Sequence, residues 1–196
     1  MKSFNVLPEG YKEIYSVNLQ KNKKTALLIN GLAIVIVVLM VIPALLYVPI
    51  STVLSFQEDL GGLLLKLGVF VFADIAYLIL HELVHGAAMK LCGTKKVKFG
   101  FTGLYAFAGS EDYYCKKPYI FIALAPVVLW GVVLAIVNFI VPVEWFWIVY
   151  VVQIVNISGA TGDFFVTVKF LGFPSDILVQ DSGVGMTVYS RESLKQ

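Results

Sequence analysis

Two histidines and a glutamate form a group whose spacing is typical of metal chemistry. The segment His81-Glu82-Leu83-Val84-His85 contains the pattern His-Glu-x-x-His, and its histidines are the only two among 196 residues. On a helix, residues four apart lie on one face, one turn above the other. Two imidazoles there can bind one Zn2+, while the neighbouring glutamate acts as general base toward a water on the metal. The sequence therefore predicts His81 and His85 as zinc ligands and Glu82 as catalytic base.

The surroundings of this motif strengthen the metal interpretation. It lies within an apolar run from about residue 62 to residue 91. A charged side chain at membrane depth costs on the order of 2.5–3.5 kcal/mol on insertion scales, so such residues usually mark function. The alternative is a structural cluster, in which the histidines hydrogen-bond to neighbouring helices and Glu82 is paired or protonated. We favour zinc.

The composition indicates an integral membrane protein. Hydrophobic residues make up 59% of the chain and charged residues 14%, and the mean hydropathy is +0.84. Soluble domains are less apolar and more highly charged. The net charge of +2 indicates little about partners, and no basic patch interleaved with aromatic residues is present. We therefore expect a lipid bilayer around the protein and no nucleic-acid partner.

Four apolar runs are each long enough to cross about 30 Å of hydrocarbon as a helix. They predict an all-α membrane protein with four transmembrane helices, at about residues 25–47, 62–91, 118–141 and 144–171. These helices form one predicted domain, residues 25–171, between an N-terminal tail (1–24) and a C-terminal tail (172–196).

The loop between the second and third helices predicts a small β-hairpin over about residues 97–107. Apolar residues alternate there on both sides of Thr102-Gly103, which is typical of two short strands joined by a turn. Two roles remain open for this hairpin. It is either a cap over the helix ends or an edge strand on which an extended substrate adds.

The distribution of charge predicts the orientation in the membrane. Of the fifteen Lys and Arg residues, all but Lys66 lie in or beside the two tails or in residues 90–117. The loops on the other side carry only Glu58, Asp59 and Glu144 as charges. By the positive-inside rule, both termini and the hairpin loop are expected in the cytoplasm.

A third metal ligand is needed, because catalytic zinc usually takes three protein ligands. No third histidine exists, and Asp163 is the only acidic residue in the fourth run apart from Glu144 at its outer end. At 1.5 Å per residue, Asp163 and His85 lie at depths that agree within roughly 3 Å. Nearby Gly159 and Gly162 predict a close approach of the helices. The alternative is a buried aspartate with a structural hydrogen bond, and we favour the ligand.

Two further polar residues lie on the same faces. Asn156 is two helical turns before Asp163, and we predict that it is catalytic, its amide donating to the developing oxyanion. The alternative is a hydrogen bond that links helices. Asp74 lies two turns before His81, too far to share its metal, and either lines a water path or pairs with Lys66.

These segments resemble a known family. His81 to Gly86, then Lys-Val-Lys-Phe-Gly-Phe, Ala-Leu-Ala-Pro in the third run, and Gly162-Asp163 are similar to the bacterial putative zincin peptidases, small four-span membrane proteins distantly similar to site-2 proteases. The resemblance implies an intramembrane zinc metalloprotease of the bacterial cell membrane, with His81, His85 and Asp163 as ligands and Glu82 as base. Site-2 proteases commonly have Asn-Pro-Asp-Gly or Leu-Asp-Gly at the third ligand, whereas Phe164 follows the aspartate here.

The function expected from these observations is that of a zinc metalloendopeptidase embedded in the membrane. It would hydrolyse peptide bonds of transmembrane or membrane-associated protein substrates. The alternative is a non-enzymatic, metal-binding membrane protein with a regulatory or partner role. Glu82 discriminates between them, because a purely structural site needs no base beside its ligands. Metal transport is disfavoured, because few carboxylates beyond Asp74 line the apolar runs.

Overall fold

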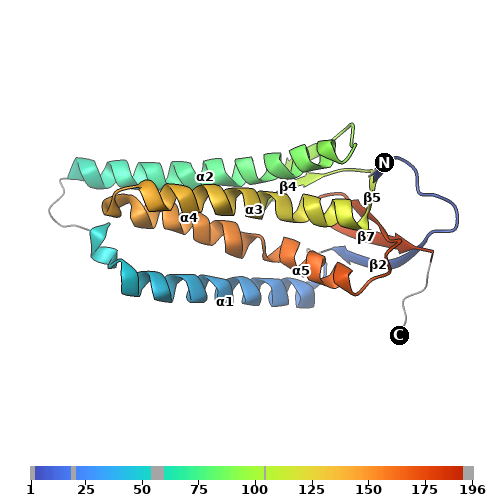
Figure 1. Cartoon of the computed structure of the whole chain (residues 1–196), viewed down its shortest axis with the longest axis horizontal. Helices are drawn as coiled ribbons and strands as arrows, with labels where there is room; N and C mark the ends of the chain where they lie inside the picture. The colour runs from blue at the N-terminus through green and yellow to red at the C-terminus, as the bar shows by residue number, and fades with distance from the viewer. Residues whose placement is uncertain (1–2, 19–20, 54–59, 104, 192–196) are drawn as a thin grey trace.

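Four apolar helical spans run along the long axis of the molecule, with the strands gathered at one end (Figure 1). The computed structural model describes residues 3–18, 21–53, 60–103 and 105–191, so Glu58 and Asp59 lie outside the described residues. All four spans are long and apolar enough to cross a membrane: α1 (Lys23–Tyr47), α2 (Leu60–Leu91), α3 (Lys116–Ile140) and the span Val143–Leu171. The prediction of four membrane helices is confirmed.

The outer surface of these spans is apolar. Leu46 of α1 is 85% exposed and Phe139 of α3 is 93% exposed. A helix that is hydrophobic on every side needs either a protein core or lipid around it. Helix α1 is capped at its start, where Asn22 accepts a hydrogen bond from the backbone N–H of Thr25 (3.2 Å). It ends at Tyr47, and its C-cap residue Val48 stands just before Pro49.

The fourth span differs from the single helix expected. A short 3-10 turn (Val143–Trp145) leads into α4 (Phe146–Gly159), and a single residue, Ala160, separates α4 from α5 (Thr161–Leu171). The Thr161 hydroxyl donates to the Ser158 carbonyl at this junction. The break starts a new helix, so Asp163 lies in the first turn of α5.

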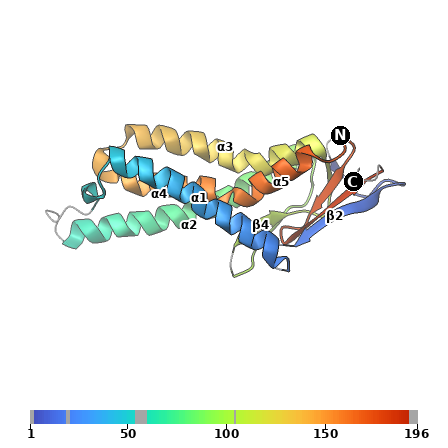
Figure 2. The same ribbon diagram turned by 90° about the horizontal axis from the view of Figure 1, so that it is seen from below.

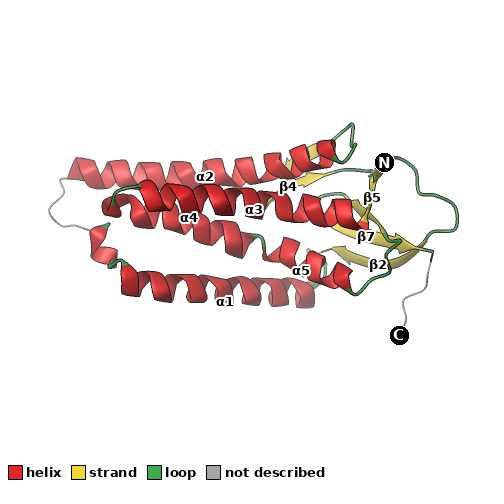
Figure 3. Cartoon of the chain, viewed as in Figure 1, coloured by secondary structure: helices red, strands yellow, loops and turns green. Residues whose placement is uncertain are grey.

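A five-stranded antiparallel sheet covers the end of the bundle (Figure 3). Its order is β1 (Ser3–Phe4), β5 (Tyr113–Cys115), β6 (Leu178–Asp181), β7 (Gly185–Ser190) and β2 (Lys12–Asn18). The prediction that a hairpin is the sole β-structure was wrong, because both predicted tails form strands. Strand β2 from the N-terminal tail pairs with β7 from the C-terminal tail, with Lys12 opposite Ser190. A local sequence pattern predicts a strand, but it does not identify a pairing partner so far away in the chain.

The predicted hairpin is confirmed as a two-stranded sheet of β3 (Lys98–Phe101) and β4 (Ala106–Gly109). Its turn includes Gly103, whose φ of +88° is a conformation that favours glycine. The hairpin packs onto α2 at Gly86, where a Cβ atom would lie only 2.4 Å from Cζ of Phe99. This glycine, next to His85 in the chain, therefore lets the hairpin approach the motif.

Two buried clusters stabilise opposite ends of the molecule. The larger lies between the sheet and the nearby ends of α2, α3 and α5, and includes Met89, Tyr114, Ile122, Phe170 and Val188. The smaller, at the far end, consists of Ala44, Val48 and Trp147. Figure 2 shows the sheet lying beyond the helix ends, with α1 crossing the other spans. The His-Glu-x-x-His motif lies at the sheet end of α2.

Candidate metal centre

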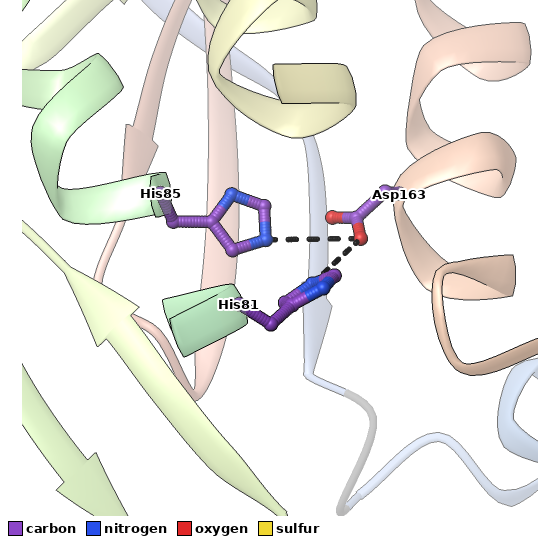
Figure 4. Close-up of side chains that lie close together, drawn as sticks. All are labelled: His81, His85 and Asp163. Atoms are coloured by element: carbon purple, nitrogen blue, oxygen red, sulfur yellow. Dashed lines mark ion pairs between the residues drawn. The ribbon is translucent and has the colours of Figure 1, made fainter. Parts of the chain in front are cut away.

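The structure brings His81, His85 and Asp163 together. Both histidines project from one face of α2, and Asp163 faces them from α5 (Figure 4). The distance from Nε2 to Oδ2 of Asp163 is 3.9 Å for His81 and 3.8 Å for His85. One ligand atom from each residue lies within 4.8 Å of the other two. Helical spacing accounts for the histidine pair, whereas Asp163 comes from a segment nearly eighty residues later.

The helix break at Ala160 contributes to the position of Asp163. A residue in the first turn of a helix lies beside backbone N–H groups that lack partners within the helix. The partial positive charge of that end favours an anionic carboxylate.

The glycines of this segment have a different role from the close helix approach that was expected. Gly159 and Gly162 line a cavity, and a Cβ atom on either would meet no other atom within 4 Å.

Hydrogen bonds orient both imidazole rings. Nδ1 of His85 lies 2.9 Å from the backbone carbonyl oxygen of Ile122. A carbonyl only accepts, so this nitrogen carries the proton and Nε2 keeps a free lone pair. Nδ1 of His81 lies 2.8 Å from the Tyr77 hydroxyl. With Nδ1 bonded in this way, Nε2 is the nitrogen that faces Asp163 in both rings.

This donor set fits a zinc ion. Two imidazole nitrogens and a carboxylate oxygen form a three-ligand set of the kind found in catalytic zinc sites. With bonds of about 2.0–2.1 Å in a tetrahedral arrangement, ligand atoms lie about 3.3 Å apart. The separations to Asp163 of 3.8 Å and 3.9 Å are slightly wider than this value. The group can therefore close on a metal ion through small side-chain movements.

Glu82 lies beside the group and lines the same cavity. The backbone N–H of Ala108 in β4 lies close to its carboxylate. Glu82 is not one of the three residues of the metal group. It follows His81 directly in the chain. A carboxylate in this position can accept a proton from a water molecule held between it and the metal site.

A cavity of about 710 Å3 adjoins these residues. Its walls include the motif face of α2, the α4–α5 junction, the hairpin residues 105–108 and Ile29 of α1. The lining is mostly apolar, and the polar groups converge at one place, as is common in binding sites.

Asp181 is a further acidic residue in this cavity that sequence reasoning did not assign a role. It ends β6 and accepts hydrogen bonds from the Tyr119 hydroxyl and from the backbone N–H of Gly183 (2.7 Å). Burial raises the pKa of the Asp181 carboxyl group. A signal existed in the sequence, because alternating residues flank Asp181-Ser182-Gly183 as in a hairpin turn. That signal predicts a turn, and it does not indicate proximity to Glu82.

The structure places the remaining candidates away from the cavity centre. Asn156 is fully buried, and its amide donates to the Val127 carbonyl (3.2 Å) and accepts from the Tyr77 hydroxyl (3.0 Å). Its proposed role at an oxyanion stays a prediction. Asp74 is outside the metal group, and its Oδ1 has no hydrogen-bond partner within the part of the chain that the structure describes.

Comparison with known protein families agrees with this geometry. Residues 75–178 match the family described as "Putative zincin peptidase", and the match covers the motif, the hairpin, α3 and Asp163. No curated protein and no solved structure matches the chain. The family match spans more than half of the 196 residues. The chain therefore belongs to the putative zincin peptidase family.

Proposed function

We propose that this protein is a zinc metalloendopeptidase embedded in the membrane, with both termini and the hairpin on the cytoplasmic side. The observation that carries the proposal is the convergence of His81, His85 and Asp163 beside Glu82, in one cavity at the end of four apolar spans. The lysine-rich segments lie at the sheet end of the bundle, which supports the orientation.

The residues have distinct roles in the proposed reaction. His81, His85 and Asp163 would hold zinc, which supplies Lewis acidity that polarises a peptide carbonyl and acidifies water. Glu82 accepts a proton from the attacking water as its oxygen bonds to the carbonyl carbon. When the carbon–nitrogen bond breaks, Glu82 transfers that proton to the leaving amine. One water molecule is consumed, and Glu82 returns to its starting state.

A substrate segment must be extended to react. An intact transmembrane helix keeps its carbonyl groups in internal hydrogen bonds, so it has to unwind before cleavage. The edge-strand role of the hairpin is supported by β4, whose one sheet partner among the described residues is β3 and whose residues 106–108 line the cavity. Transmembrane or membrane-associated protein segments are the proposed substrates.

The test compares the wild-type protein with the Glu82→Gln variant in detergent. Bound zinc per chain is measured together with cleavage of a panel of single-span substrates. Because Glu82 is proposed as base and not as ligand, the variant should keep its zinc and lose cleavage by at least about 100-fold. Glu144→Gln is the matched control, since Glu144 is exposed near the far end of the bundle.

Two results would count against the proposal. If the wild-type protein holds no divalent metal, the site itself is wrong. If the wild-type protein holds zinc and cleaves none of the substrates, a non-enzymatic metal-binding protein with a regulatory or partner role becomes the better explanation.

A further inference from the structure

A chain of buried hydrogen bonds extends from His81 across the bundle. Nδ1 of His81 lies 2.8 Å from the Tyr77 hydroxyl, which donates to Oδ1 of Asn156 over 3.0 Å. Nδ2 of Asn156 then donates to the Val127 carbonyl over 3.2 Å. We infer that Tyr77 and Asn156 are positioning residues for His81, which hold its ring so that Nε2 faces the metal site. The inference rests on the metal site of the proposed function.

The hydrogen-bonding capacities of these groups determine the direction of the chain. A tyrosine hydroxyl has one hydrogen, and in Tyr77 that hydrogen is donated to Asn156. The Tyr77 oxygen must therefore accept from Nδ1–H of His81, which leaves Nε2 unprotonated. The amide of Asn156 cannot rotate without loss, because its NH2 group is bound to Val127. The chain thus selects one tautomer and one orientation of His81.

The two histidines are oriented by different means. His85 donates directly to a backbone carbonyl, that of Ile122 in α3. The His81 ring instead depends on two side chains, Tyr77 one turn earlier in α2 and Asn156 in α4. Both side chains can be changed by substitution. Tyr77 is 5% exposed and Asn156 is fully buried. In apolar surroundings an unpaired polar group costs about 1–3 kcal/mol, so each group holds its neighbour in place.

The packing around Tyr77 limits its movement. The indole ring of Trp130 in α3 lies edge-on to the Tyr77 ring, with centroids 6.5 Å apart and an interplanar angle of 82°. The Tyr77 ring also meets the His81 ring edge-on at 5.6 Å. Tyr77 is therefore held by α3 and α4 as well as by its own helix, and it transmits that placement to His81.

The first test measures zinc affinity by competition with a chelator. Replacing Tyr77→Phe removes the hydroxyl and keeps the ring, so it should weaken zinc binding about 10–100-fold, as the loss of an outer hydrogen-bond partner of a metal ligand does. The absorption spectrum of the Co2+-loaded protein should also change, because it reports ligand geometry. Tyr150→Phe is the matched control. Its hydroxyl donates to the Met40 carbonyl (3.0 Å) far from the site, and affinity and spectrum should match the wild type.

A second variant tests the same chain without altering Tyr77. Asn156→Leu removes the acceptor, so it should weaken zinc binding in the same direction. If both residues act through His81, the double variant should bind zinc no more weakly than Tyr77→Phe alone, because the effects of coupled residues are not additive. A merely structural role of Asn156 between α3 and α4 would lower thermal stability in both variants and leave the cobalt spectrum unchanged.

The outcomes separate this inference from the proposed function. Zinc bound by the wild type and equally well, within about twofold, by folded Tyr77→Phe or Asn156→Leu protein would overturn the positioning role alone. A wild-type protein that binds no metal would overturn both. Reduced affinity with an altered cobalt spectrum in both variants supports the inference, whether or not a cleavable substrate has been found.

Discussion

The two ends of the helix bundle are built differently. At the far end, α1 and α4 pack directly against each other through aromatic side chains. Trp147 donates to the Val48 carbonyl at the end of α1 (3.2 Å), and the Tyr150 hydroxyl donates to the Met40 carbonyl in α1 (3.0 Å). At the sheet end, a cavity of about 710 Å3 lies among the helices and is bounded by the hairpin. The first and fourth spans are in direct contact where no catalytic candidate lies, and the bundle leaves space where polar groups converge.

This difference separates stability from chemistry. The contacts that Trp147 and Tyr150 make with the first span at the far end involve no carboxylate and no histidine. The sheet end gathers two histidines and three carboxylates around one space, and burying such groups is costly unless they are paired or bind a metal. We therefore expect substitutions at the far end to change stability alone, and substitutions at the sheet end to change metal binding or pH dependence as well.

The largest effect is expected from the metal group itself. Asp163→Asn removes the anionic ligand and should weaken zinc binding by more than about 100-fold, beyond what the loss of an outer partner costs. Asp74→Asn is the matched control, because Asp74 is also an aspartate in a membrane span and is outside the metal group. Chelator competition measures both. Equal zinc affinity in the two variants would remove Asp163 from the site.

The turn that brings Asp181 to the cavity should be the next most sensitive feature. Gly183 has a φ of +82°, and a Cβ atom there would lie 2.1 Å from Cδ2 of Phe107. Gly183→Ala should therefore cost about 2–4 kcal/mol of unfolding free energy, from backbone strain and overpacking together. Gly103→Ala carries the same kind of strain (φ +88°) in open space and should cost only about 1 kcal/mol. Denaturant unfolding in mixed micelles compares them, and equal losses would show that the Phe107 contact is unimportant.

The smallest effect concerns pH and contrasts the two ends directly. Because burial raises the folded-state pKa of Asp181, the wild-type protein should lose stability as pH rises from the unfolded pKa, about 3.9, through the folded value. Asp181→Asn cannot titrate, so its thermal stability relative to the metal-free wild type should increase over that pH range. Trp147→Phe removes one hydrogen bond at the far end and should cost about 1 kcal/mol at every pH. If the difference in thermal stability between Asp181→Asn and the wild type did not change with pH, burial would not raise the pKa of Asp181.

Much of the fold could be predicted because its signals are local. Twenty or more consecutive apolar residues predict a spanning helix wherever they occur, and alternation on both sides of Thr102-Gly103 predicted β3 and β4. The five-stranded sheet was missed, because β2 and β7 lie at opposite ends of the chain and neither strand identifies its partner. The break at Ala160 was also missed, since the apolar run continues through it.

The sequence by itself determined the histidine pair and its glutamate, because helical geometry places residues four apart on one face whatever surrounds them. It also limited the third member of the group to a few residues, since few acidic side chains occur in the apolar runs. Only the tertiary structure decided that Asp163 faces the histidines, that Tyr77 and Asn156 orient His81, and that Asp181 reaches the cavity from the terminal sheet. These contacts join separate helices and strands, and their geometry depends on packing between elements that no local pattern encodes.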